Sequence, residues 1–175
     1  MDWVTQAGAT TLRTRAARTI LAETDVSVVR GNASEILSLS DGISAGKGVD
    51  ASQSVESAGV AARHLARTLC TTLAITGPVD LVTDGVRVVR ISGGHGLMPV
   101  VTGTGCSATA LIGAFLAVDP DPVSAAATAL AFFGAAGEKA GETAGGPGTF
   151  MVHLLDALYA LSPEEVEARC RIEVE

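Results

Sequence analysis

The run Thr102-Gly103-Thr104-Gly105-Cys106 is the strongest candidate for chemistry in this sequence. Its glycines leave backbone N–H groups accessible to an anion, and the apolar helix expected to start there would point its positive dipole end at the same place. A phosphoryl group developing negative charge at this point would be stabilised by fixed donors. The alternative interpretation is that the two glycines only form a tight turn from a strand to a helix.

The same run also fits the dinucleotide pattern G-x-G-x-x-A, which ends at Ala108. That match is weak because the run comes late in the chain and no clear βαβ unit precedes it. The sequence contains no G-x-x-x-x-G-K-[ST] phosphate loop. The spacing therefore indicates an anion-binding turn without identifying its ligand.

Cys106 stands where the positive end of a helix would favour a thiolate. The alternative is that Cys106 is a small buried apolar residue, as most free cysteines are. A nucleophilic pair with His95 is a third reading, although nothing in the sequence orients the two side chains. A cysteine hydrolase is accordingly a remote hypothesis.

A cation and a carboxylate flank the segment Arg30-Gly31-Asn32-Ala33-Ser34-Glu35, which follows a short β-branched run. Ligands of open α/β sheets bind beyond the carboxyl ends of strands, so Arg30 is a candidate to bind phosphate and Glu35 to hold a magnesium-bound water. The alternative is structural: Glu35 forms a capping box with Asn32, and Arg30 makes a surface ion pair. Thr76-Gly77-Pro78 likewise reads either as a site or as a turn.

The elements that would position these residues alternate between strands and helices, which predicts an α/β layer architecture. Helical spacing predicts helices at 10–23, 32–39, 55–69, 108–118, 123–137 and 150–161, and a further helix start at 162–165. Runs of β-branched and apolar residues predict strands at 26–29, 72–76 and 171–175. A hairpin is expected at 81–91, with its turn at Asp84-Gly85. The chain is expected to begin in a glycine-containing loop with no strand of its own.

Composition limits the classes of function. Hydrophobic residues make up 47% of the 175 residues, which favours a folded core in one domain, and the net charge of −7 without a basic cluster argues against nucleic acid. The apolar stretches are too short to span a bilayer, and no signal peptide is recognisable, so a cytoplasmic protein without a membrane partner is expected. Three widely spaced cysteines argue against a disulfide framework or a structural zinc site.

Taken together, several segments make the chain resemble the hydroxyethylthiazole kinases of the ribokinase-like superfamily. Cysteine at position 106 is the most specific feature, because related sugar and vitamin kinases usually carry aspartate there. The matching segments, in the order of the family, are residues 7–10, 29–36, 47–50, 74–80, 102–106 and 146–150.

The resemblance implies a ribokinase-like three-layer α/β sandwich, formed here by residues 1–175 as one domain that corresponds to the C-terminal two-thirds of the family fold and lacks its N-terminal strands and helices. It implies Mg²⁺-dependent transfer of the γ-phosphoryl group of ATP to the primary alcohol of 4-methyl-5-(2-hydroxyethyl)thiazole, in thiamine biosynthesis or salvage. It also implies a homo-oligomer, a trimer with sites between subunits.

By position, the resemblance assigns ATP contacts to Arg30 and Thr76, a substrate contact to Gly103, the neighbourhood of the acceptor hydroxyl to Cys106, and the metal to Glu35. Thr102, Gly103, Thr104 and Gly105 form the phosphate loop. The lead-in to Ala7-Gly8-Ala9-Thr10 departs from the family pattern, so Asp2 either replaces an aspartate of the family or that aspartate is lost. A catalytically inactive fragment that folds or associates with partner subunits is the alternative to an active kinase.

Overall fold

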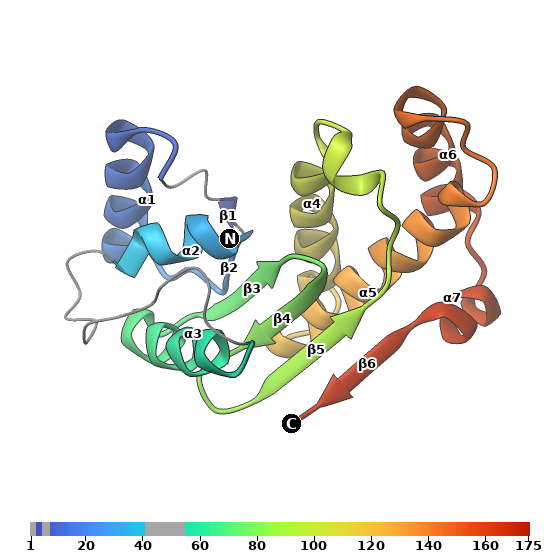
Figure 1. Cartoon of the computed structure of the whole chain (residues 1–175). Coiled ribbons are helices and arrows are strands. Elements are labelled where there is room, and N and C mark those ends of the chain that lie inside the picture. Colours follow the sequence, from blue (N-terminus) through green and yellow to red (C-terminus); the bar gives the residue numbers. More distant parts are fainter. Residues whose placement is uncertain (1–2, 5–7, 41–54) are drawn as a thin grey trace.

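A computed structural model describes residues 3–4, 8–40 and 55–175 of the chain, and its strands form one mixed sheet in the order β1-β2-β3-β4-β5-β6 (Figure 1). The strands are β1 (Trp3–Val4), β2 (Val28–Asn32), β3 (Thr72–Thr76), β4 (Val79–Thr83), β5 (Val88–Ser92) and β6 (Arg171–Val174). The helices are α1 (Thr11–Glu23), α2 (Ala33–Ser40), α3 (Val55–Leu69), η1 (Met98–Val100), α4 (Thr104–Leu116), α5 (Pro122–Gly141), α6 (Pro147–Ala160) and α7 (Pro163–Arg169).

The pairing of the strands changes once within the sheet, from parallel to antiparallel. β1, β2 and β3 run parallel, whereas β3 to β6 pair antiparallel. In the parallel part, Asn32 at the end of β2 pairs with Thr76 at the end of β3. The carboxyl ends of β2 and β3 therefore meet at one edge, where β4 also begins.

Alternating residues of the strands face two helical layers, as expected for a pleated sheet buried on both faces. Val28, Ala74 and Val82 belong to the cluster packed against α4, α5 and α6. Val29 and Leu73 pack on the opposite side with buried residues of α1, α2 and α3. Figure 1 shows α3 in front of the strands and α5 behind them, so the fold is a three-layer α/β sandwich.

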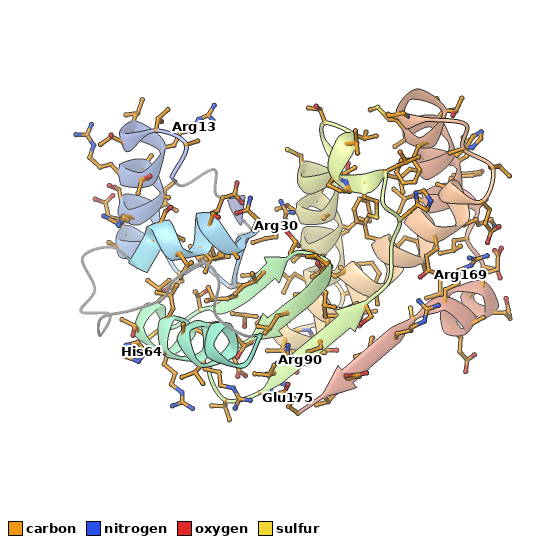
Figure 2. All side chains as sticks on the ribbon, in the orientation of Figure 1. Arg13, Arg30, His64, Arg90, Arg169 and Glu175 are labelled. Carbon is orange, nitrogen blue, oxygen red and sulfur yellow. The ribbon has the colours of Figure 1, made fainter. Side chains whose placement is uncertain are left out.

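The C-terminal segment is tied to the sheet and to α5 by ion pairs. Nε of Arg90 and Nη2 of Arg63 both donate to the carboxylate of Glu175, at 2.6 and 3.0 Å (Figure 2 labels Arg90 and Glu175). On the other side, Nη1 of Arg171 donates to Glu138 at 2.6 Å. These pairs are partly exposed and individually contribute little stability, but together they fix the register of β6 on β5.

Most of the expected elements are present, several with other limits, and one expectation is wrong. The strand expected at 26–29 spans Val28–Asn32, and the helix expected at 108–118 spans Thr104–Leu116. The helix at 55–69 and the strand at 72–76 have the expected limits, and the hairpin turns at Asp84-Gly85, where Gly85 has φ +91°. The expectation of no strand before the first helix is wrong, because Trp3 and Val4 pair in parallel with Val29 and Arg30. No helix within the described ranges is long and apolar enough to cross a membrane.

The core behind the sheet should depend strongly on Phe150. This side chain is fully buried in the cluster of α4, α5 and α6, and its ring stacks on that of His95 with centroids 5.5 Å apart. We expect Phe150→Ala to lower the free energy of unfolding by about 3–5 kcal/mol in urea denaturation, through lost burial and the cavity left behind. Val118, just beyond α4, is 83% exposed, and Val118→Ala should change stability by no more than about 0.5 kcal/mol. Equal effects of both substitutions would contradict this assignment of the core.

Candidate functional site

Arg30 and Thr76 are joined across two strands. Arg30 lies in β2 and is half-buried, and its Nη2 donates a hydrogen bond of 2.6 Å to Oγ1 of Thr76 at the end of β3. Figure 2 shows Arg30 beside β2, on the side of α4. The expectation that these two residues share a site at the carboxyl edge of the sheet fits this geometry.

The glycine run forms the N-terminus of α4. Gly103 is the N-cap residue, with φ +100°, and no side chain of the described residues caps the helix. In the described part of the chain, no atom lies within 4 Å of the place that a Cβ at Gly103 would take, so there the space in front of the first turn is open. An uncapped helix N-terminus that faces open space, with its N–H groups directed outward, is suited to an anion.

A loop packed on α5 positions this N-terminus. Oγ1 of Thr104 donates to the carbonyl oxygens of Met98 and Val101, at 3.0 and 3.1 Å. Met98 itself lies against Gly137 of α5, where a Cβ would come within 2.6 Å of its sulfur. The absence of a side chain at Gly137 therefore leaves room for the Met98 side chain against α5.

Gly105 brings the loop and Arg30 together. A Cβ at Gly105 would lie 2.6 Å from Nη1 of Arg30, which is closer than real carbon atoms approach. The guanidinium thus occupies the space that a side chain at position 105 would need. A side chain at position 105 would have to displace the guanidinium from this place, so Gly105 lets Arg30 lie against the start of α4.

Burial and neighbouring charges act in opposite directions on Arg30. Burial lowers the pKa of the guanidinium, while Glu35, Asp80 and Cys106 raise it through their charges. Glu35 and Cys106, which were expected at the site, therefore act on the same cation as Asp80, which was not expected there.

Asp80 is the residue that sequence reasoning missed. It lies in β4, and its Oδ1 accepts a hydrogen bond of 2.9 Å from the backbone N–H of Gly77. Burial raises the pKa of its carboxyl to about 6, although the Gly77 bond and the charge of Arg30 both lower it. The available signal was an aspartate within a strand between Val79 and Leu81, where an ionised group is costly.

Glu35 has the capping role that the structural alternative predicted. Its Oε2 accepts from the N–H of Asn32 at 2.7 Å, and Oδ1 of Asn32 accepts from the N–H of Glu35 at 2.9 Å. Among the described residues, no group of three or more His, Cys, Asp or Glu side chains could hold a metal ion. Mg²⁺ commonly uses one or two carboxylates together with phosphate oxygens and water, and Glu35 fits that kind of site beside Arg30.

Cys106 is exposed on the first turn of α4, so the reading of a buried packing residue is wrong. His95 is held by other groups: its Nδ1 accepts from the N–H of Leu97 at 3.2 Å, and its ring stacks on Phe150 and lies against Gly141. These contacts give His95 a packing role. The dinucleotide pattern also lacks its context, because η1 rather than a strand precedes the run.

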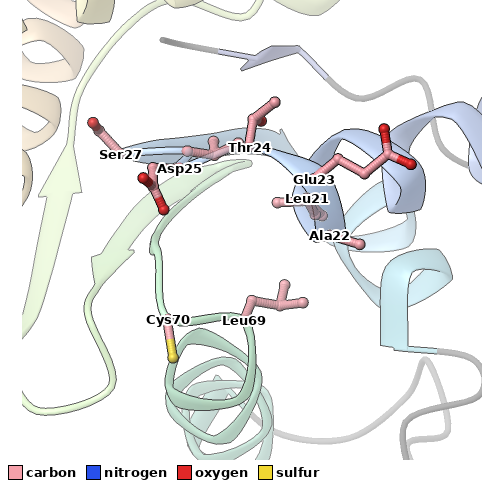
Figure 3. A pocket seen from close by; sticks show the side chains of 9 residues that line it. Leu21, Ala22, Glu23, Thr24, Asp25, Ser27, Leu69 and Cys70 are labelled. Atoms are coloured by element: carbon pink, nitrogen blue, oxygen red, sulfur yellow. The ribbon is translucent and has the colours of Figure 1, made fainter.

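A cavity of about 410 Å³ lies at the opposite end of β2 (Figure 3). It is lined by the last turns of α1 and α3 and by residues 25–27, which precede the strand. The amino ends of β2 and β3 are at this edge, so the cavity is separate from Arg30 and the glycine run. The segments at Asp2, Ala7 and 47–50 lie outside the described residues.

Comparisons with known proteins agree on one family. The model of the hydroxyethylthiazole kinase family matches residues 1–164. A hydroxyethylthiazole kinase of Desulfotalea psychrophila is 65% identical over 165 residues, which are 94% of this chain and 60% of that protein. One of Cereibacter sphaeroides (strain ATCC 17029) is 54% identical over 146 residues, 83% of this chain and 55% of that protein.

A solved structure, that of the hydroxyethylthiazole kinase protein from Pyrococcus horikoshii OT3, superposes with a TM-score of 0.89 at 38% identity. It covers 99% of this chain, which spans 65% of that structure. The chain thus spans about 60% of the length of the curated relatives that it matches.

The raised pKa of Asp80 predicts a pH dependence of stability. The folded state binds this proton up to about pH 6, whereas an unfolded aspartate releases it near pH 3.9, so ionisation disfavours folding increasingly as the pH rises between these values. Asp80→Asn removes the titration and keeps an acceptor for Gly77. We expect the stability of this variant relative to wild type to increase by about 1–3 kcal/mol from about pH 4 to pH 7 in urea denaturation.

Asp84→Asn is the control, and the opposite trend is expected for it. Burial tends to raise the pKa of Asp84, but hydrogen bonds from Arg87 and Val86 lower it overall, so its ionisation favours the folded state. Parallel pH profiles for wild type and Asp80→Asn would contradict the buried state of Asp80.

Proposed function

The chain belongs to the hydroxyethylthiazole kinase family, and we propose that it transfers the γ-phosphoryl group of ATP to the primary alcohol of 4-methyl-5-(2-hydroxyethyl)thiazole, in thiamine biosynthesis or salvage. The observation that carries the proposal is the convergence of Arg30, Thr76 and the uncapped N-terminus of α4 at one edge of the sheet. A cation, a hydroxyl and free backbone donors at one point are suited to a phosphate chain.

Arg30 and Thr76 are proposed to bind the phosphates of ATP. Arg30 directs Nη2 toward Thr76 and Nη1 toward Gly105, so its charge lies between the end of β3 and the glycine run. The N–H groups of the run, Thr102 to Cys106, would stabilise the negative charge that develops on the transferred group. Fixed donors of this kind need no reorganisation during the reaction.

Glu35 is the residue proposed to hold Mg²⁺, directly or through a water molecule. Its Oε2 is engaged by Asn32, and this hydrogen bond orients the carboxylate on the first turn of α2. When bound, the ion would neutralise charge on the phosphate oxygens.

Gly103 and Cys106 are proposed to face the acceptor alcohol. The open space at Gly103 would admit the substrate, and Cys106 is exposed one turn further along α4. The hydroxyl oxygen of the alcohol forms a bond to the γ-phosphorus as the bond to the β-phosphate oxygen breaks. The hydroxyl proton leaves to Sγ of Cys106, and ADP and the phosphate ester are the products.

We also propose that the chain works in the cytoplasm as a homo-oligomer, a trimer as the resemblance implies. One face of α6 supports association, because it exposes large apolar side chains that a single chain leaves in water. These residues are Met151, Val152, Leu155 and Tyr159. No feature of the described residues favours a catalytically inactive chain over an active one.

Binding of Mg-ATP or Mg-ADP tests the proposed function. Arg30→Ala should weaken nucleotide binding by about 1.5–3 kcal/mol, because a hydrogen bond from a charged donor is lost. Isothermal titration calorimetry on folded protein provides the measurement. Arg13→Ala is the control, since Arg13 is exposed on α1, and it should bind like wild type. A folded wild-type chain that binds neither nucleotide would contradict the proposal.

Single-turnover phosphorylation of the thiazole alcohol tests the role of Cys106. Cys106→Ala should slow the chemical step about 100-fold with unchanged nucleotide affinity, whereas Cys106→Asp should retain the rate because a carboxylate also accepts a proton. Cys70→Ala is the control, since Cys70 is another exposed cysteine and lies beside the cavity at the opposite edge of the sheet. An unchanged rate in Cys106→Ala would show that Cys106 takes no part in the chemical step, and that the backbone donors stabilise the transition state without it.

A further inference from the structure

Four residues of β2, β3, β4 and the turn between β3 and β4 form a ring at the carboxyl edge of the sheet, in which two links are hydrogen bonds and the link between Asp80 and Arg30 is charge attraction alone. Arg30 of β2 donates to Thr76 at the end of β3, and Gly77 follows Thr76 in the chain. The N–H of Gly77 donates to Asp80 of β4, and the charge of Asp80 acts back on Arg30.

Each link of the ring restricts a different degree of freedom. The hydrogen bond from Gly77 to Asp80 spans the turn between β3 and β4 at 2.9 Å, and it therefore limits rotation of the backbone next to Thr76. The hydroxyl of Thr76 in turn receives one arm of the Arg30 guanidinium at 2.6 Å. The other arm lies against Gly105, at the start of α4.

We propose that Asp80 is a positioning residue of the phosphate site, which holds the Thr76–Gly77 turn and the Arg30 guanidinium in the arrangement that receives a phosphate group. The inference rests on the proposed function. Asp80 acts through its neighbours. Its Oδ1 accepts a hydrogen bond from Gly77, whereas Arg30 and the glycine run supply the groups that would contact the ligand.

The surroundings of Asp80 agree with this role. Asp80 is half-buried, and its burial outweighs the attraction of Arg30, so that its carboxyl has a raised pKa of about 6. A carboxyl that only served solubility would be placed in water. Pre-organised groups bind more tightly because less conformational freedom is lost when the ligand arrives.

Three substitutions at position 80 separate the links. Asp80→Ala removes the acceptor and the charge, Asp80→Asn removes only the charge, and Asp80→Glu keeps the charge but moves the acceptor oxygen away from Gly77. The probes are Mg-ADP and inorganic pyrophosphate, titrated calorimetrically into variants shown to be folded by circular dichroism. Asp84→Ala is the matched control, since Asp84 accepts from Val86 and Arg87 in the turn at the other end of β4.

We expect Asp80→Ala and Asp80→Glu to weaken binding of both probes about tenfold or more, because the acceptor for Gly77 is lost or displaced. Asp80→Asn and Asp84→Ala should change binding less than about threefold, because the amide keeps that acceptor and the charge of Asp80 only supplements the hydrogen-bonded links. In a Thr76→Val background, where the ring is already broken, Asp80→Ala should weaken binding further by less than about threefold. If Asp80 contributed only to stability, its substitution would lower the urea midpoint, and its effect on probe binding would be the same with and without Thr76→Val. If Asp80→Ala does not fold, the same comparison is made with Asp80→Glu, alone and in the Thr76→Val background.

Three results would overturn the inference, and they are distinguishable. Wild-type protein that binds the probes while Asp80→Glu binds equally well would overturn the positioning role and leave the proposed function intact. Wild-type protein that binds neither probe would overturn both, because the site would then receive no phosphate. Independent, additive effects of Thr76→Val and the Asp80 substitution would also contradict a shared ring.

Discussion

Arg30 carries a positive charge into a half-buried position, and neighbouring groups must offset the cost of dehydrating it. Burial lowers the pKa of the guanidinium, and the charges of Glu35 and Asp80 oppose this effect. The arrangement of the site follows from that requirement. Thr76 gives Nη2 an acceptor, and Gly105 gives Nη1 space. Dehydration of the cation takes place when the chain folds, so a phosphate that arrives later meets a charge already stripped of much of its water.

The change from parallel to antiparallel pairing brings the partners of Arg30 together. Parallel β2 and β3 deliver Arg30 and Thr76 to one edge, and antiparallel β4 returns from that edge with Asp80 only four residues after Thr76. A parallel β4 would have needed a crossover, which would place its start at the far edge. The two-residue turn Gly77-Pro78 is therefore sufficient to link Thr76, the candidate for ATP binding, to the strand of Asp80, whose charge acts on Arg30.

Local patterns were sufficient to predict much of the fold and part of the site. Helical periodicity defined 55–69, and the spacing of Asn32 and Glu35 predicted a capping box that the structure contains. The contact between Arg30 and the glycine run depends on residues that are distant in the chain, so only the resemblance indicated it beforehand. Asp80 was missed because the burial of a strand aspartate is a property of the assembled sheet. The two-residue β1 is too short for any periodicity to show.

The composition of α5 has a consequence for temperature. Its buried face consists mainly of alanine, including Ala125, Ala126, Ala129 and Ala136, with Gly137 where the loop before α4 packs. Such a helix approaches the sheet closely and loses little side-chain entropy on folding, but each residue removes little apolar surface from water. The heat capacity of unfolding grows with the apolar surface exposed. The alanine-rich face of α5 therefore contributes little to this heat capacity for its length, which lessens the curvature of the stability of the fold with temperature.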